Sequence, residues 1–306
     1  MMNKQNFQFQ SLDWLLLIAL SFAWGASFFF AKVALIEWPF AWIVAMRLIL
    51  ALLSMLFVTK ILGIKLPMTA YSLKVYAILG LINNFIPFTL FTAAQLFISS
   101  SLTAVLNAVT PLSIIALALI LPIEERVTPT RIAAVLLGFS GVFVMLLPAF
   151  SGAPTALNLA IGIGIATIGS LFYAAGGLFG RRHQSIQPLA LATGMILFSC
   201  LYSVLFALLT TPFPRFMPQA NTILSLIGLG VLSTAVAYMI YYNLLKRVGA
   251  ANTASVTFLI PVTTITLGVL ILDESFTLNQ LAGMACIFFG LALLDSRWLK
   301  FFKRSP

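Results

Sequence analysis

The chain has 306 residues, of which 61% are hydrophobic and only 8% are charged, and its formal net charge is +10. A soluble domain carries roughly 25% charged residues, so this composition excludes a water-soluble globular protein, a disordered chain and a disulfide scaffold. The solvent for most of this protein is therefore lipid.

Long apolar stretches follow one another along the chain, separated by short breaks that contain proline and charge. A bilayer core of about 30 Å is crossed by roughly 20 helical residues, and stretches without period-two alternation are typical of helices and not of barrel strands. We expect spans near residues 12–34, 40–59, 72–96, 101–122, 130–147, 157–180, 188–210, 222–245, 250–272 and 279–296. The sequence predicts an all-α integral membrane protein with ten transmembrane helices.

Lysine and arginine are distributed unevenly over the breaks, which predicts the orientation in the membrane. Alternate breaks, counted with both termini, carry fourteen of the 17 basic residues, whereas the other breaks carry only Lys32 and Arg215, and Arg47 lies within a span. This distribution puts both termini in the cytoplasm and the protein in the cell inner or plasma membrane. Because the positive charge is an orientation signal, we expect no nucleic-acid partner.

The two halves of the chain resemble each other at an offset of 149 or 150 residues. Ala104–Pro111 lies over Ala254–Pro261, and Pro39 lies over Pro188. Each half holds five expected spans, an odd number, so the second copy is inverted relative to the first. We expect residues 1–150 and 151–306 to be two inverted-topology repeats of one bundle. Such repeats are typical of secondary transporters, which expose a midplane site to alternate sides of the membrane.

The segment Phe22–Lys32 (FAWGASFFFAK), followed by Pro39 and Arg47, resembles the first two spans of EamA-type members of the drug/metabolite transporter superfamily. The stretch Gly249–Leu294 and its first-half counterpart, Ala104–Gly141, fit the same pattern. The resemblance implies a ten-helix bundle and the efflux of a metabolite or drug. It leaves the substrate open, because members carry amino acids, purines, sugars and cations.

Polar side chains inside lipid-embedded helices are costly unless they face protein or a water-filled cavity. Asn84 and Phe88 share one stripe of the third span, and their counterparts 150 residues later are Thr234 and Tyr238. We expect stripes on the third, fourth, eighth and ninth spans to line a substrate cavity, and aromatic residues of the first and sixth to close it. The expected cavity residues are Trp24, Asn84, Phe88, Asn107, Thr110, Pro111, Tyr173, Thr234, Tyr238, Tyr241, Thr257 and Pro261. The alternative for each is ordinary packing, or a hydroxyl bond to its own helix.

Five charged residues have an expected role in gating or in binding charge: Lys32, Arg47, Glu124, Arg181 and Glu274. Arg47 lies about 12 Å inside the second span at 1.5 Å per residue. Its partners are therefore carbonyl groups, a distant acid or a substrate carboxylate. The resemblance places an arginine here whatever the substrate, which favours a structural role. By symmetry we hypothesise two alternating gate contacts, Lys32–Glu274 outside and Arg181–Glu124 inside; the alternative is that these charges only snorkel to the interface.

The sequence predicts a secondary transporter that exports or exchanges an amino acid, a purine-like or a drug-like solute by alternating access. The alternatives are a non-transporting membrane scaffold or receptor, and a channel. We expect no enzymatic activity, cofactor or metal, because the GFSG run at residues 138–141 has no histidine nearby and no P-loop or Cys/His cluster occurs. The expected partners are a small-molecule substrate and the lipid bilayer, with a second copy in a homodimer as a further candidate.

Overall fold

The computed structural model describes residues 10–120, 128–150, 155–183 and 185–294. All regular structure within these ranges is helical. The helices before residue 150 are α1 (Ser11–Ala34), α2 (Phe40–Ile61), α3 (Ala70–Leu79), η1 (Gly80–Phe85), α4 (Ile86–Ala94), α5 (Ser100–Asn107), α6 (Thr110–Ile120), α7 (Pro129–Leu146) and η2 (Leu147–Phe150). Those after it are α8 (Ala156–Arg181), α9 (Pro188–Thr210), α10 (Ala220–Ile227), η3 (Gly228–Val236), α11 (Ala237–Thr253), α12 (Val256–Leu272) and α13 (Leu278–Leu294).

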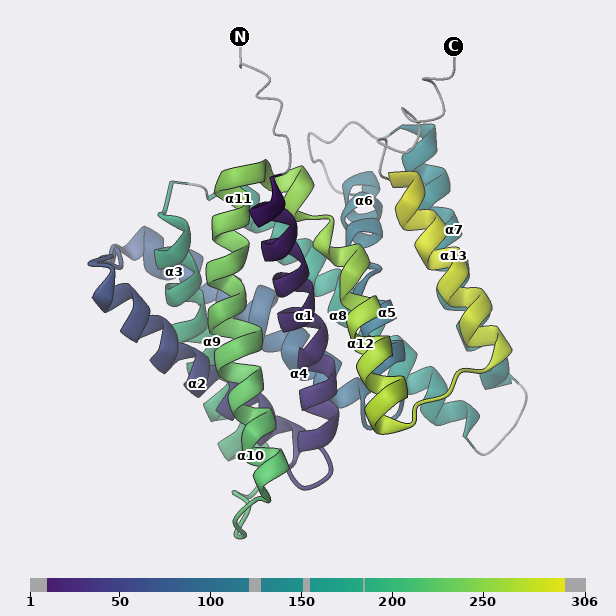
Figure 1. The fold of residues 1–306 in the computed structure, drawn as a ribbon, viewed down its shortest axis with the longest axis horizontal. Helices are drawn as coiled ribbons and strands as arrows, with labels where there is room; N and C mark the ends of the chain where they lie inside the picture. Colours follow the sequence, from purple (N-terminus) through teal and green to yellow (C-terminus); the bar gives the residue numbers. More distant parts are fainter. Residues whose placement is uncertain (1–9, 121–127, 151–154, 184, 295–306) are drawn as a thin grey trace.

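Eight continuous helical segments in the described chain have the length and apolar composition of a membrane span, and α12 and α13 are shorter apolar helices. Four of the eight are composite. The segment Pro129–Phe150 joins α7 and η2. The segment Ala70–Ala94 joins α3, η1 and α4; Ser100–Ile120 joins α5 and α6; and Ala220–Gly249 joins α10, η3 and most of α11. The first residues of α1 and the last of α13 lie at the same end of the bundle (Figure 1).

Six of the seven spans expected between residues 12 and 210 match the observed segments to within two residues at each end, and the fifth ends three residues later than expected. The eighth and ninth differ. The chain leaves the helical path at Gly249, which has φ +77°. Glycine adopts this positive φ without the steric cost that a Cβ atom would bring. A turn at residues 254–255 follows, so α12 begins at Val256 instead of near the expected residue 250.

The bundle is built from pairs of helices that combine the two halves of the chain. α2 packs along α9, α7 along α13, and α1 along α12, while α8 packs against α5 and α6. Backbones approach closely in the α7–α13 pair. A Cβ atom on Gly141 would lie 2.5 Å from the carbonyl oxygen of Gly283, and one on Gly283 equally close to that of Gly141. This contact therefore requires glycine on both helices.

Two π-helical segments, η1 and η3, interrupt the third and eighth spans, which sequence periodicity did not predict. π-helical turns occur frequently at functional sites. Each lies where the chain meets the other half: a Cβ on Gly80 of η1 would lie 2.7 Å from the Met195 carbonyl oxygen in α9, and one on Gly230 of η3 would lie 2.9 Å from the Arg47 carbonyl oxygen in α2. The hydroxyl of Ser199 also donates to the Gly80 carbonyl at 2.9 Å. η1 and η3 therefore each pack closely on a helix of the other half.

Candidate functional site

A buried arginine lies between the two halves of the chain. Arg47 of α2 is 8% exposed, and its Nε donates to the hydroxyl oxygen of Thr234, in η3, at 3.0 Å. Its guanidinium carbon lies 3.7 Å from the centre of the Phe88 ring, in α4. A cation–π contact on one side and a hydrogen bond at the edge fix the plane of the guanidinium group.

Asn84, in η1 of the third span, and Tyr238, in α11 of the eighth, form a second contact between the halves. The Tyr238 hydroxyl donates to Oδ1 of Asn84 at 2.8 Å. Asn84 is fully buried, and its Nδ2 has no hydrogen-bond partner in the described chain. Because Asn84 and Phe88 are four residues apart, as are Thr234 and Tyr238, the two contacts lie about one helical turn from each other.

Aromatic rings extend this central cluster on both sides. Trp24 of α1 lies against Tyr241 of α11, with the ring centres 5.5 Å apart. Tyr173 of α8 stacks on Phe91 of α4 at 5.5 Å and meets Phe88 edge-on at 6.4 Å. The structure thus brings together Trp24, Asn84, Phe88, Tyr173, Thr234, Tyr238 and Tyr241 of the expected cavity residues, with Arg47 among them.

The other expected cavity residues, on the fourth and ninth spans, have no hydrogen bond to Arg47 or Asn84 in the described chain. The Thr110 hydroxyl donates to the Asn107 carbonyl at 2.7 Å, a bond within its own segment. Pro111 follows the break between α5 and α6, whereas Pro261 lies inside the continuous helix α12. Thr257 lies one turn before Pro261 and is half-buried. These residues stay predicted cavity residues.

Lys32 and Glu274 bind the two ends of the same loop, between α4 and α5. The Lys32 ammonium donates to the carbonyl oxygens of Gln95 at 2.5 Å and Ile98 at 3.2 Å. Glu274 accepts the backbone N–H groups of Ser100 at 2.7 Å and Ser101 at 3.0 Å, and the hydroxyls of both at 2.8 and 2.5 Å. A cation at the end of α4 and an anion at the start of α5 each complement a helix dipole. We call Lys32, Glu274 and the main chain of residues 95–101 the α4–α5 clamp.

The two hypothesised gate contacts stay predictions. Lys32 and Glu274 have no salt bridge with each other in the described chain, since each binds the loop between them. Arg181 is the last residue of α8, and its expected partner, Glu124, lies outside the described residues. An ion pair that the sequence reasoning missed joins Asp13, at the start of α1, to Arg247, near the end of α11, at 2.5 Å. The two residues lie far apart along the chain, and no sequence pattern links them.

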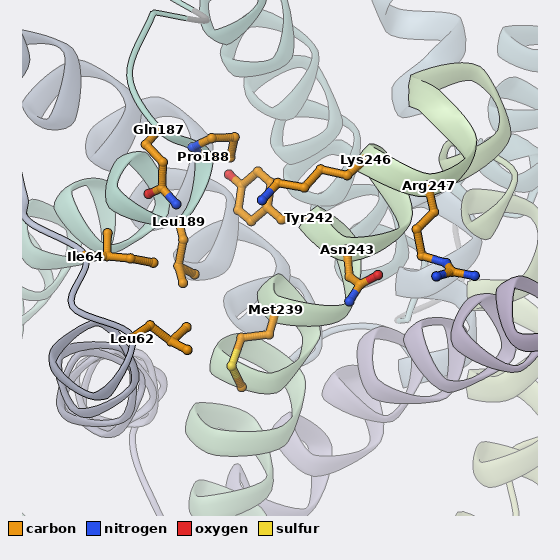
Figure 2. A pocket seen from close by; sticks show the side chains of 10 residues that line it. All are labelled: Leu62, Ile64, Gln187, Pro188, Leu189, Met239, Tyr242, Asn243, Lys246 and Arg247. Atoms are coloured by element: carbon orange, nitrogen blue, oxygen red, sulfur yellow. The ribbon is translucent and has the colours of Figure 1, made fainter. Parts of the chain in front are cut away.

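A cavity of about 420 Å³ opens at the end of the bundle where α1 begins, because Arg247 in its lining pairs with Asp13 at the start of α1. Figure 2 shows the lining side chains. The cavity lies between the end of α2, the start of α9 and the end of α11, and is lined by Leu62, Ile64, Gln187, Pro188, Leu189, Met239, Tyr242, Asn243, Lys246 and Arg247. Tyr242 stacks on Tyr238 with the ring centres 6.0 Å apart. This tyrosine pair connects the cavity wall to Asn84.

Comparisons with known proteins agree with this architecture. The chain is 26% identical over 290 residues to a probable amino-acid metabolite efflux pump of Salmonella typhimurium, covering 91% of this chain and 93% of that protein. It is 24% identical to an uncharacterized transporter of Archaeoglobus fulgidus over 222 residues, 72% of this chain and 76% of that one. One solved crystal structure shares the fold, with a TM-score of 0.65 and 20% identity, over 97% of this chain and all of that one.

The amino-acid sequence matches a protein-family model in both halves of the chain. A model of the EamA-like transporter family matches residues 13–147 and matches again over residues 160–294. With its many apolar helices, the chain is an integral, multi-pass membrane protein. It belongs to the EamA-like transporter family.

Proposed function

We propose that this protein is a secondary transporter that exports or exchanges a small organic metabolite across the inner or plasma membrane by alternating access. In this proposal ten spans form two inverted five-helix repeats, residues 1–150 and 151–306, with both termini in the cytoplasm. The observation that carries it is the central cluster, where Arg47 meets Thr234 and Asn84 meets Tyr238. Both of these hydrogen bonds join one half of the chain to the other, as a site between two rocking halves requires.

Matched contacts support the repeat. Trp24 against Tyr241 and Tyr173 against Phe91 are the same contact shifted by 149 or 150 residues, with the partners exchanged between halves. Gly80 against α9 and Gly230 against α2 are related in the same way. The two matches of one family model, to residues 13–147 and 160–294, agree with this division.

The two ends of the bundle differ in a way that suits one state of an alternating-access cycle. At the end where α1 begins, the cavity of about 420 Å³ reaches Tyr242. At the other end, the α4–α5 clamp ties α1 to the loop that follows α4 and the α12–α13 connection to the start of α5. Transport requires this clamp to release when the opposite end closes. We assign the clamped end to the outside, where the gate residues Lys32 and Glu274 are expected.

Amino-acid metabolites are the first candidate substrates, because a relative covering nearly the whole chain is named a probable amino-acid metabolite efflux pump. Purine-like and drug-like solutes remain candidate substrates. A scaffold or receptor has no need of a buried arginine between its halves. A channel has no need of a closed end that is opposite an open cavity.

Counterflow into proteoliposomes tests the proposal. Vesicles loaded with an unlabelled solute from a panel of amino acids and nucleobases should transiently accumulate the labelled solute, which a carrier produces and a channel does not. Replacing Tyr238→Phe removes the hydroxyl bonded to Asn84 and should lower counterflow about tenfold, the loss expected for a bond of about 1.4 kcal/mol. The matched change Tyr71→Phe, at a side chain that is 51% exposed, should leave it unchanged. Absence of counterflow with the whole panel would contradict the proposal.

A further inference from the structure

Arg47 presents more hydrogen-bond donors than the described chain satisfies. A guanidinium group carries five N–H bonds, and only the Nε–H of Arg47 donates to a described residue, Thr234. The side chain is nevertheless 92% buried, since it is 8% exposed. A buried charge with open donors is costly unless an acceptor meets it. The arrangement therefore calls for an acceptor that the chain itself does not supply.

The acidic residues of the described chain lie at helix ends. Asp13 pairs with an arginine at the end of α11, Glu37 accepts two hydrogen bonds at the start of α10, Glu274 binds the start of α5, and Asp273 ends α12. None of these carboxylates, and no carbonyl oxygen of a described residue, accepts a hydrogen bond from Arg47. The sequence leaves three candidate partners for Arg47: a carbonyl group, a distant acid or a substrate carboxylate. The described residues supply neither of the first two. A substrate carboxylate is the third.

The geometry suits a carboxylate. Phe88 covers a face of the guanidinium plane, and Thr234 occupies its Nε edge, so the Nη groups remain open in the plane where a carboxylate binds with two parallel hydrogen bonds. Asn84, which is bonded to Tyr238 one helical turn from Thr234, adds an unpartnered, fully buried Nδ2. The open polar groups of this cluster are thus donors, which select an acceptor-rich, negatively charged ligand group.

Helix packing does not explain the arginine. In the proposed repeat the counterpart of Arg47, 149 residues later in α9, is Ile196, which is fully buried. Both helices make the same close approach to a π-helical segment of the other half, through Gly230 and Gly80. Because α9 packs in this way with an isoleucine, the packing of α2 needs no charge at this position.

We propose that the Arg47 guanidinium and the Asn84 amide bind the carboxylate of the transported solute. The substrates are then carboxylates whose remainder is apolar or aromatic, matching the rings of Phe88, Tyr173 and Tyr238. Lys246, which extends beside Tyr242 in the cavity wall (Figure 2), gives the route inward a positive charge that attracts anionic groups. This inference rests on the transport function proposed above.

Ligand-induced thermal stabilisation of the purified full-length protein tests the site without requiring flux. The probes are L-leucine, L-phenylalanine and their primary amides, which keep the side chain and lose the carboxylate. The wild type should bind each acid at least about tenfold more tightly than its amide, the discrimination expected for loss of a charge-assisted hydrogen bond. Arg47→Gln should bring this ratio close to one, whereas Lys65→Gln, at an exposed residue outside the cavity lining, should preserve it.

A second variant covers the case in which Arg47→Gln does not fold. Thr234→Asp places a resident carboxylate against the guanidinium group, so it should raise the melting temperature of the free protein and abolish the response to both acids. The proposal is overturned if acids and amides bind the wild type equally, if neither acid binds, if the acid preference survives Arg47→Gln, or if Thr234→Asp keeps the response to both acids. If acid and amide show equal counterflow, the protein is a transporter but the carboxylate site is wrong. If the protein binds acids selectively but shows no counterflow, the site stands and the transport function is wrong.

Discussion

Removing the carboxylate of the α4–α5 clamp should destabilise the protein far more than removing an exposed helix cap. Glu274→Ala leaves the backbone N–H groups of Ser100 and Ser101 without an acceptor, and both residues are fully buried. An orphaned buried donor costs about 1–3 kcal/mol, so the pair predicts a loss of about 2–6 kcal/mol. The hydroxyls of the two serines can turn to other acceptors, and we add nothing for them.

The next backbone N–H at the start of α5, that of Leu102, does not depend on Glu274. Leu102 donates to the hydroxyl of Ser99, the N-cap residue, so that bond persists in the variant. Glu37 provides the matched control: it also accepts from the start of a helix, at Gln219 and Thr222, but Gln219 is exposed and water can replace the carboxylate. Glu37→Ala should cost about 1 kcal/mol or less.

The assay is thermal melting of the purified protein in one detergent at one scan rate. With about 2–4 °C lost per kcal/mol, Glu274→Ala should melt on the order of 10 °C below the wild type, and Glu37→Ala within about 3 °C of it. Glu274→Gln should fall between the two, because its amide keeps one acceptor oxygen but turns a donor toward the remaining N–H. Equal melting temperatures for Glu274→Ala and Glu37→Ala would refute the reasoning.

Two further predictions follow from contacts described above. Exchanging the clamp charges, Lys32→Glu with Glu274→Lys, should give counterflow no higher than either single variant, because the new glutamate faces carbonyl oxygens and the new lysine faces N–H groups; recovery would indicate a direct gate pair instead. Gly141→Ala should lower the melting temperature by the equivalent of about 1–3 kcal/mol, since its Cβ would lie 2.5 Å from the Gly283 carbonyl oxygen. Gly164→Ala, with nothing within 4 Å of the added Cβ, should match the wild type or exceed it, and an equal loss in both variants would contradict the packing argument.

Hydropathy alone placed most of the helices, because lipid forces apolar residues into uninterrupted helical segments. The prediction was poorest near Gly249, where a backbone conformation and not a change in hydropathy ends the helix. The stripes that hold Asn84 and Tyr238 follow from spacing that a helix preserves. The contact between these two side chains was not predicted.

The rest of the site was not predictable from spacing. The bond between Arg47 and Thr234 joins residues 187 positions apart, and Glu274 reaches Ser100 over 174. Arg47 was expected to matter because charge is rare in a span, and Glu274 because of its counterpart in the other repeat. Which groups they bind depends on how the halves dock. The partners of Lys32 are carbonyl oxygens, which every residue carries, so no sequence pattern marks them.

The π-helical segments have a consequence for how the third and eighth spans are mapped by experiment. A π turn holds more residues than an α turn, so side chains before Gly80 and after Phe85 follow two helical wheels that are rotated against each other. The same holds on either side of residues 228–236. A cysteine scan of residues 70–94 interpreted with one period of 3.6 would assign one of its ends to the wrong face. Accessibility plotted separately for α3 and α4 should instead give two clean periodicities with different phases.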